Sequence, residues 1–191
     1  MNKTTNIMIV GVGGQGTLLA SRILGNAVIR MGYDVKVSEV HGMSQRGGSV
    51  VTYVKYGEKV YSPIIDNGEA DIILAFELLE AYRAMPALKK GGRLIVNNQR
   101  INPMPVITGA AQYPEDILGK LSAKVSTTSV DALALATEAG SIKAVNVVLI
   151  GLMAKNTDIP YDVWLETIRT TVPPKFLDVN LKAFELGYNA Q

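Results

Sequence analysis

The sequence of 191 residues contains no cysteine and a single histidine. The absence of cysteine excludes disulfide bonds, thiolate nucleophiles, thiolate-bound zinc and cysteine-ligated iron–sulfur clusters within this chain. The one histidine, His41, cannot build a metal site unaided, and no Asp or Glu near it in the sequence has ligand spacing with it. We therefore expect no metal site in this chain.

Charged residues and long apolar runs are also scarce. Charged residues make up 19% of the chain, the formal net charge is +2, and no basic run indicates nucleic-acid binding. No apolar stretch reaches the length of a membrane span, and the first ten residues, MNKTTNIMIV, have too short an apolar run for a signal peptide. These features predict a cytoplasmic protein that binds neither nucleic acid nor membrane.

Apolar residues, by contrast, are abundant, at 48% of the chain. A chain of this length can bury one α/β domain well and is too short for two ordinary ones. Because the apolar fraction is high for a monomer of this size, we expect a partner chain, or a second copy when the protein is isolated, to cover part of its surface.

Short apolar segments alternate along the chain with segments of helical periodicity. The alternation predicts a single Rossmann-like α/β domain over residues 1–191, with a mostly parallel sheet and a helical C-terminal part from about residue 129. The expected strands are 7–10, 34–40, 49–56, 71–76, 93–97 and, at an edge, 123–128, with a further short strand at 106–107. The expected helices are 18–31, 81–88 (closed by the charges and glycines of 89–92), 114–121, 131–139, 142–154, 161–171 and 174–188.

The first strand runs directly into a glycine-rich turn, GVGGQG, that precedes the first helix. Its glycines satisfy the pattern G-x-G-x-x-G, in which glycine permits a tight turn and a close approach of the backbone to a ligand. The N–H groups at the start of the following helix favour an anion. We predict ligand binding here, the alternative being that the glycines serve only close packing of strand and helix. The predicted cofactor-binding residues of this turn are Gly11, Gly13, Gly14, Gln15 and Gly16.

A second polar segment, residues 41–48, reads HGMSQRGG and has no hydrophobic periodicity. Imidazole titrates near neutral pH and can act as an acid, a base or a hydrogen-bonding group. An arginine followed by two glycines could grip a phosphate or carboxylate with help from backbone N–H groups. We favour function here over a surface loop that only turns the chain. The predicted residues are His41, Gln45 and Arg46 for catalysis, with Ser44 and Gly47 for cofactor binding.

Glu39 suggests a different function. It lies 23 residues beyond Gly16 (39 − 16), near where nicotinamide-binding folds place the carboxylate that holds a ribose hydroxyl. A free-standing NAD(P)-binding Rossmann protein that uses Gly11, Gly13, Gly16 and Glu39 is therefore an alternative. Against it, the chain has no separate substrate domain and no Y-x-x-x-K pair of short-chain dehydrogenases, and a strand-end glutamate can equally contact a neighbouring loop. A purely structural subunit, whose glycine motifs serve packing alone, is a third possibility.

Asn146 interrupts an otherwise apolar helical segment, KAVNVVLIGLMA. Burying an amide costs free energy unless the amide is hydrogen-bonded. We therefore expect its side chain to make an interhelical or helix-to-loop hydrogen bond rather than to contact a ligand. The apolar character of residues 145–154 predicts a helix that is buried on all sides or lies at a subunit contact.

Two segments together, GVGGQGTLLASRIL at 11–24 and SEVHGMSQRGGSV at 38–50, resemble the small, gamma-type subunits of 2-oxoacid:ferredoxin oxidoreductases. Within that family they are most similar to the beta subunits of indolepyruvate ferredoxin oxidoreductases, and the resemblance extends over essentially the whole chain. It implies one subunit of an oxygen-sensitive complex that oxidatively decarboxylates a 2-oxoacid, indolepyruvate or another arylpyruvate, to an acyl-CoA and passes the electrons to ferredoxin.

In that family, thiamine diphosphate and the iron–sulfur clusters belong to other chains or domains. The resemblance therefore implies that this chain binds no cofactor alone, is inactive alone, and works with a larger subunit that carries thiamine diphosphate and iron–sulfur clusters. The lack of cysteine agrees, as does the lack of a GDG that begins a thiamine-diphosphate motif, although Asn97 and Asn98 could mimic its end. The segment 41–48 is then expected to reach the interface near thiamine diphosphate or the incoming CoA.

Overall fold

The computed structural model describes residues 4–41 and 48–190, with His41 described by its backbone, and it contains one sheet of six strands. The spatial order of the strands is β2-β3-β1-β4-β5-β6. β1, β4, β5 and β6 run parallel to one another, whereas β3 is antiparallel to both of its neighbours, β1 and β2. The expected mostly parallel α/β sheet is therefore confirmed. The strands are β1 (Thr4–Val12), β2 (Asp34–His41), β3 (Ser49–Gly57), β4 (Ala70–Ala75), β5 (Leu88–Asn97) and β6 (Ser126–Val130).

The position of β3 distinguishes this sheet from a dinucleotide-binding one. In the doubly wound dinucleotide fold, the strand that follows the first helix pairs directly with the first strand. Here β3 forms a hairpin with β2 and inserts between β2 and β1. As a result, the ends of β1 and β2 and the start of β3 lie at one edge of the sheet, which we call the carboxyl edge.

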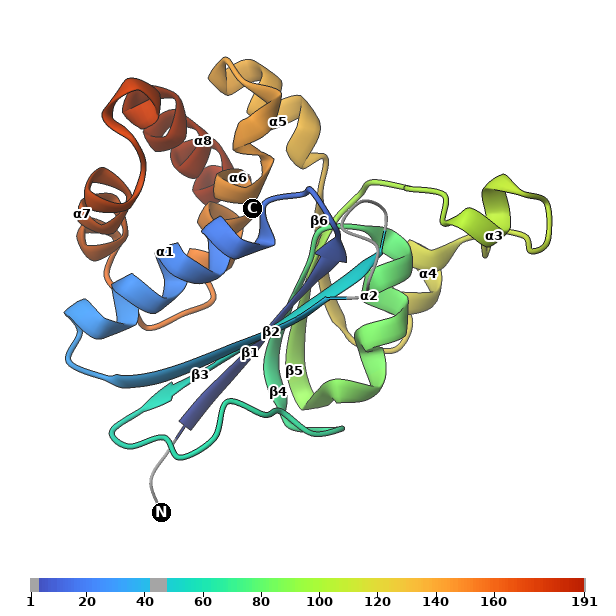
Figure 1. Cartoon of the computed structure of the whole chain (residues 1–191), viewed down its shortest axis with the longest axis horizontal. Helices are drawn as coiled ribbons and strands as arrows, with labels where there is room; N and C mark the ends of the chain where they lie inside the picture. The colour runs from blue at the N-terminus through green and yellow to red at the C-terminus, as the bar shows by residue number, and fades with distance from the viewer. Residues whose placement is uncertain (1–3, 42–47, 191) are drawn as a thin grey trace.

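Helices cover both faces of the sheet (Figure 1). α1, α5, α6, α7 and α8 cover one face, and α2 and α4 cover the other. The helices are α1 (Thr17–Arg30), α2 (Leu78–Ala84), α3 (Met104–Ile107), α4 (Ile117–Ser122), α5 (Ala132–Ala139), α6 (Val145–Ala154), α7 (Tyr161–Thr171) and α8 (Leu177–Asn189), with short 3₁₀ turns at η1 (Met85–Ala87), η2 (Ile142–Ala144) and η3 (Pro174–Phe176).

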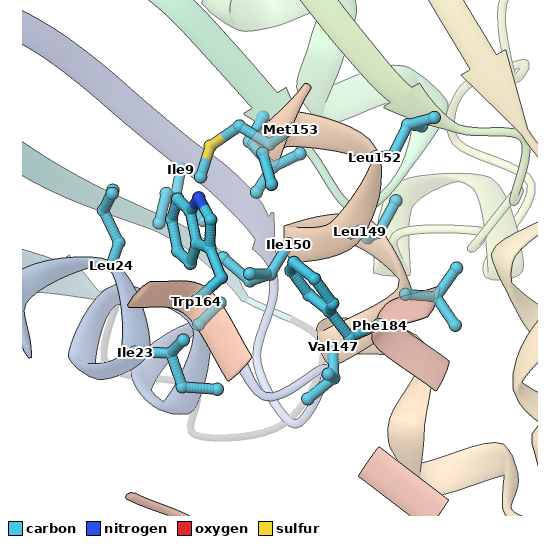
Figure 2. Packing of buried hydrophobic residues seen from close by; sticks show 14 of the residues in the cluster. Ile9, Ile23, Leu24, Val147, Leu149, Ile150, Leu152, Met153, Trp164 and Phe184 are labelled. Atoms are coloured by element: carbon cyan, nitrogen blue, oxygen red, sulfur yellow. The ribbon is translucent and has the colours of Figure 1, made fainter. Parts of the chain in front are cut away.

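The larger hydrophobic core is built around α6. Every residue of this helix from Asn146 to its end is buried, which confirms the expected burial on all sides. Figure 2 shows Trp164 of α7 and Phe184 of α8 packed near the side chains of α6, with Ile9 of β1 beside them. Aromatic rings bury a large apolar area each, so Trp164 and Phe184 are major contributors to this core.

α2 and the start of β5 differ from expectation. The predicted helix at 81–88 begins earlier, because the Glu77 carboxylate caps it by accepting a hydrogen bond from the Glu80 N–H. It also ends earlier, in a 3₁₀ turn that contains Pro86, a residue without the N–H that would continue the helix. Residues 89–92 therefore lie within β5 and do not close the helix.

The segment between β5 and β6 also corrects three expectations. Residues 106–107 belong to α3 and not to a strand, since the prolines at 103 and 105 favour a first helical turn. The helix expected at 114–121 begins later, after Asp116, whose carboxylate accepts a hydrogen bond from the Gly119 N–H. β6 likewise begins at Ser126 rather than at residue 123, and it is the edge strand that the sequence predicts.

Candidate functional site

The glycine turn joins β1 to α1 at the carboxyl edge. Gly14 and Gly16 have φ angles of 99° and 85°, in the left-handed region that side chains other than glycine rarely adopt. A Cβ atom on Gly11 would lie 2.9 Å from Gln15 Oε1 and 3.0 Å from Phe76 Cβ, so this glycine is needed for packing. The turn thus requires glycine for its own geometry, before any ligand is considered.

Asn146 holds the end of the turn. Its Nδ2 donates a hydrogen bond of 3.3 Å to the carbonyl of Gly16, and its Oδ1 accepts one of 2.9 Å from the Val147 N–H. A Cβ on Gly16 would lie 2.7 Å from Asn146 Nδ2. The expected helix-to-loop hydrogen bond of this buried amide is confirmed, and it ties α6 to the turn.

The side-chain amide of Gln15 forms hydrogen bonds to other atoms of this chain. Its Oε1 accepts a hydrogen bond of 2.7 Å from the Val12 N–H, and its Nε2 donates to the Phe76 carbonyl at 3.0 Å and to Gln99 Oε1 at 3.2 Å. Both N–H groups of the amide are therefore directed at protein atoms. Gln15 connects the turn to the ends of β4 and β5.

Gln99 is a site residue that sequence reasoning missed. Its Oε1 accepts hydrogen bonds from Gln15 Nε2 and, at 3.0 Å, from Asn97 Nδ2, so its own amino group points away from both. Gln99 also lines a cavity beside the turn. The position of Gln99 just beyond β5 could have indicated a site residue, because ligands of open α/β sheets bind at the carboxyl ends of strands.

This cavity, of about 430 Å³, lies between the turn, α5 and the start of α6. Its lining includes Gln99 and Lys143, whose side chains can donate hydrogen bonds, and Gly16, the N-cap of α1, which provides no side-chain cap for the first N–H groups of that helix. The size is within the range of small-molecule sites. Such a lining suits an anionic group attached to an apolar moiety. The lining residues are Gly14, Gln15, Gly16, Gln99, Leu133, Ile142, Lys143 and Val145.

The segment 41–48 begins and ends beside the glycine turn. The backbone of His41 pairs with Val50, and the carbonyl of Gly48 accepts a hydrogen bond of 2.9 Å from the Gly13 N–H. Ser44, Gln45, Arg46 and Gly47 lie outside the described residues, as does the side chain of His41, so their roles stay predictions.

The buried carboxylate of Glu80 bonds to Ser49, the residue that follows the segment 41–48. Ser49 Oγ donates a hydrogen bond of 2.5 Å to Glu80 Oε2, and Arg83 Nη1 donates one of 2.6 Å to Glu80 Oε1. Glu80 is only 4% exposed. Sequence reasoning did not single it out, because its partner Ser49 is distant in the chain. The contact fixes the start of β3 at the carboxyl edge.

Glu39 does not occupy the position that nicotinamide binding requires. Its Oε2 accepts a hydrogen bond of 3.3 Å from Thr52 Oγ1 on β3. Because β3 separates β2 from β1, Glu39 is not on the strand adjacent to the glycine turn. The arrangement disfavours the free-standing NAD(P)-binding alternative. The glutamate contacts a neighbouring strand and not the loop that the other expectation named.

Across residues 4–41 and 48–190 the structure offers neither a cluster of metal ligands nor a membrane-spanning helix. Within these ranges no three His, Asp or Glu side chains are grouped so that they could hold a metal ion. Among the same residues, no helix combines the length and the apolar character needed to cross a bilayer.

Comparison with known proteins identifies the family. The family described as pyruvate ferredoxin/flavodoxin oxidoreductase matches residues 6–190. The indolepyruvate oxidoreductase subunits IorB of Thermococcus kodakarensis and Pyrococcus horikoshii are 48% and 46% identical over 200 residues, with 98% of this chain and 96% of each relative covered. The crystal structure of the gamma subunit of a keto/oxoacid ferredoxin oxidoreductase from Geobacter sulfurreducens PCA is 26% identical, with a TM-score of 0.70 and 96% of both chains covered. The chain belongs to the pyruvate ferredoxin/flavodoxin oxidoreductase family, as a gamma-type subunit of a 2-oxoacid:ferredoxin oxidoreductase that is homologous to IorB.

Proposed function

We propose that this chain is the small subunit of an indolepyruvate (or other arylpyruvate):ferredoxin oxidoreductase and that its carboxyl edge completes the active site of a larger subunit. The reaction converts the 2-oxoacid and CoA to an acyl-CoA, CO₂ and a proton, and it transfers two electrons to ferredoxin. The observation that carries the proposal is the hydrogen bond of 2.9 Å from the Gly13 N–H to the Gly48 carbonyl, which joins the two motifs at one edge of the sheet.

The composition of this chain indicates which cofactors the larger subunit must bind. With no cysteine, it cannot ligate the iron–sulfur clusters, which we assign to the larger subunit. Thiamine diphosphate, also assigned to the larger subunit, supplies the decarboxylation chemistry when bound. The contribution of this chain is to bind and orient substrates from one side.

In this proposal the segment 41–48 supplies hydrogen bonds and charge. Arg46 can form paired, charge-assisted hydrogen bonds to the 2-oxoacid carboxylate, the diphosphate or CoA. His41 and Gln45 add hydrogen bonds to the same groups, and Ser44 and the backbone of Gly47 assist. The contact of Glu80 with Ser49 supports this role, since it fixes the point at which the segment rejoins the sheet.

The glycine turn forms the second part of the proposed site. Gly14 and Gly16 line the 430 Å³ cavity together with Lys143, and Gly16 is the N-cap of α1, where no side chain caps the first N–H groups. An anionic group of CoA or of the substrate fits these donors. Gly11, Gly13 and Gln15 maintain the shape of the turn, through the packing of Gly11 and the hydrogen bonds of the other two.

The test is reconstitution of the complex from this chain and its larger subunit, with ferredoxin reduction as the assay. We expect turnover that depends on the 2-oxoacid and CoA from the mixture and from neither chain alone. Arg46→Ala should lower kcat/KM by roughly 100-fold, the typical effect of removing one positioned donor to developing charge. The matched control is Arg30→Ala, at the far end of α1, where the guanidinium bonds Thr170.

Two results would contradict the proposal. Unchanged turnover of the Arg46→Ala complex removes the segment 41–48 from the mechanism. Saturable binding of NAD(H) or NADP(H) to the isolated chain, measured by titration, favours the free-standing alternative.

A further inference from the structure

An arm projects from the carboxyl edge between β5 and α4. We define the arm as residues 98–112, which include α3, and Figure 1 shows α3 standing away from the layers of the domain. None of these residues is buried, and within α3 only Val106, which is half-buried, packs against a hydrophobic core. Met104 and Ile107 therefore take no part in covering the sheet.

The composition of the arm is that of a contact surface. From residue 101 to residue 114 the sequence contains no Asp, Glu, Lys or Arg, although such residues make up 19% of the chain. Met104 and Ile107, one helical turn apart, are each 65% exposed. Depletion of charge and enrichment in methionine mark the cores of protein interfaces, so this exposed surface is suited to burial by a partner.

Hydrogen bonds within the arm hold its backbone in place. The Ile107 N–H donates a hydrogen bond of 3.1 Å to the Pro103 carbonyl, and the Ala111 N–H donates one of 3.0 Å to the Pro105 carbonyl. Both prolines restrict the backbone further. A preorganised element loses little conformational entropy when it docks.

A buried carboxylate clamps both ends of the arm. Glu77, 1% exposed, accepts a hydrogen bond of 3.1 Å from the Ile101 N–H and another from the Tyr113 hydroxyl. The Tyr113 ring is nearly buried, and the Arg100 guanidinium lies 4.3 Å from its centroid. These contacts fix the direction in which the arm leaves the sheet.

The base of the arm adjoins the glycine turn. Gln99 accepts the hydrogen bond of 3.2 Å from Gln15 Nε2, and its carbonyl accepts one of 3.0 Å from the Leu78 N–H. The arm is therefore continuous with the edge that the proposed function turns toward the larger subunit.

We propose that the arm docks into an uncharged, apolar recess of the larger subunit, with Met104 and Ile107 as the buried anchors. The proposal rests on the proposed function, which supplies the larger subunit. An uncharged recess is the complementary surface, because a charged group facing the arm would lose water without gaining a partner.

The experiment measures the affinity of the full chain for its larger subunit, with the double substitution Met104→Glu and Ile107→Glu. We expect affinity to fall by roughly 30-fold or more, the effect of losing an interface hot spot. Both side chains are exposed, so the Tm of the isolated chain should be unchanged. The matched control is Tyr61→Glu with Ile64→Glu, at residues 87% and 48% exposed in the segment that connects β3 to β4 at the opposite edge.

The outcomes distinguish docking of the arm from the other possibilities. Loss of affinity in the arm variant, with a native Tm and a control that binds normally, supports docking of the arm into the larger subunit. Unchanged affinity overturns the arm's role and leaves the proposed function intact. If the isolated chain forms a dimer that only the arm variant disrupts, while the complex still assembles, the arm pairs with a second copy and the proposal is wrong. Full activity of the larger subunit alone, with no affinity of the unaltered chain for it, contradicts the proposed function itself. The milder pair Met104→Ala and Ile107→Ala gives the same decision should the charged variant fail to fold.

Discussion

Glu77 is the residue at which α2, the arm and the carboxyl edge meet. Its two carboxylate oxygens accept hydrogen bonds from the Glu80 N–H, the Ile101 N–H and the Tyr113 hydroxyl. Burying a carboxylate is costly unless its oxygens are hydrogen-bonded, and here all three donors are neutral groups. Loss of any one of them leaves a buried charge less well compensated, so the cluster is expected to be sensitive to substitution.

This cluster predicts a loss of stability in alkaline solution. Burial, followed by the hydrogen bond to Glu77, raises the pKa of Tyr113 above its ordinary value. In the unfolded chain the phenol ionises at about pH 10, whereas the folded chain keeps the proton to higher pH. Because the folded state then binds more protons, the free energy of unfolding should fall as pH rises above about 9.

Tyr113→Phe should remove part of this fall, and it should lower stability at pH 7 by about 1–2 kcal/mol through loss of the bond to Glu77. Urea unfolding between pH 7 and pH 10.5 measures both effects. Burial also raises the pKa of Tyr56 and Tyr161, so a smaller alkaline fall remains. Tyr61→Phe, at a residue 87% exposed, is the control. Identical pH dependence of Tyr113→Phe and the unaltered chain would show that the phenol does not contribute.

The sequence could predict single residues only where the need for a partner was local. Asn146 lies in an apolar run, so its amide had to be paired, and the kind of bond was predictable. Glu80 and Gln99 gave no such signal, because their partners, Ser49 and Gln15, come from distant segments. Gln15 was predicted as a ligand-binding residue, and the structure adds its role in holding the turn.

At the scale of elements, α6 and α8 form the closest helix pair of the larger core. A Cβ on Gly151 would lie 2.1 Å from the Phe184 carbonyl oxygen, and one on Gly187 would lie 2.0 Å from the Val148 carbonyl oxygen. The two backbones are thus in direct contact. A side chain at either position would force the helices apart.

Gly151→Ala should therefore lower the free energy of unfolding by about 3 kcal/mol, at the upper end of the usual cost of overpacking. Gly25→Ala is the matched control, since it lies inside α1 with a Val37 methyl 4.0 Å from the added Cβ. Alanine is the better helix former, so the control should be neutral or more stable by up to about 1 kcal/mol. Urea denaturation compares the two. Equal stability of Gly151→Ala and the unaltered chain would refute the close contact.

Elements with strong periodicity were predictable, and those defined by pairing were not. α7 was predicted at its observed bounds, and α1 within one residue at each end. The bounds of α2 were wrong, because a side chain at residue 77 and a proline at residue 86 determine where it begins and ends. The place of β3 between β1 and β2 depends on hydrogen bonds between distant segments, which periodicity does not encode.

At the scale of the whole molecule, the features of the proposed site lie together at the carboxyl edge of the sheet. The carboxyl edge gathers the glycine turn, the start of β3, the cavity with Lys143 and the base of the arm. Family membership and the mostly parallel α/β sheet were predictable from two motifs and the alternation of elements. The cavity and the arm's clamp were not, because each is assembled from segments far apart in the chain.

Hydrogen exchange of the isolated chain and of the chain within its complex tests the central claim most directly. If the carboxyl edge faces the larger subunit, the amides of residues 13–19 and 101–109 should exchange more slowly in the complex, while those of residues 57–61 at the opposite edge stay unchanged. Slower exchange confined to residues 57–61, with residues 13–19 unaffected, would contradict the account.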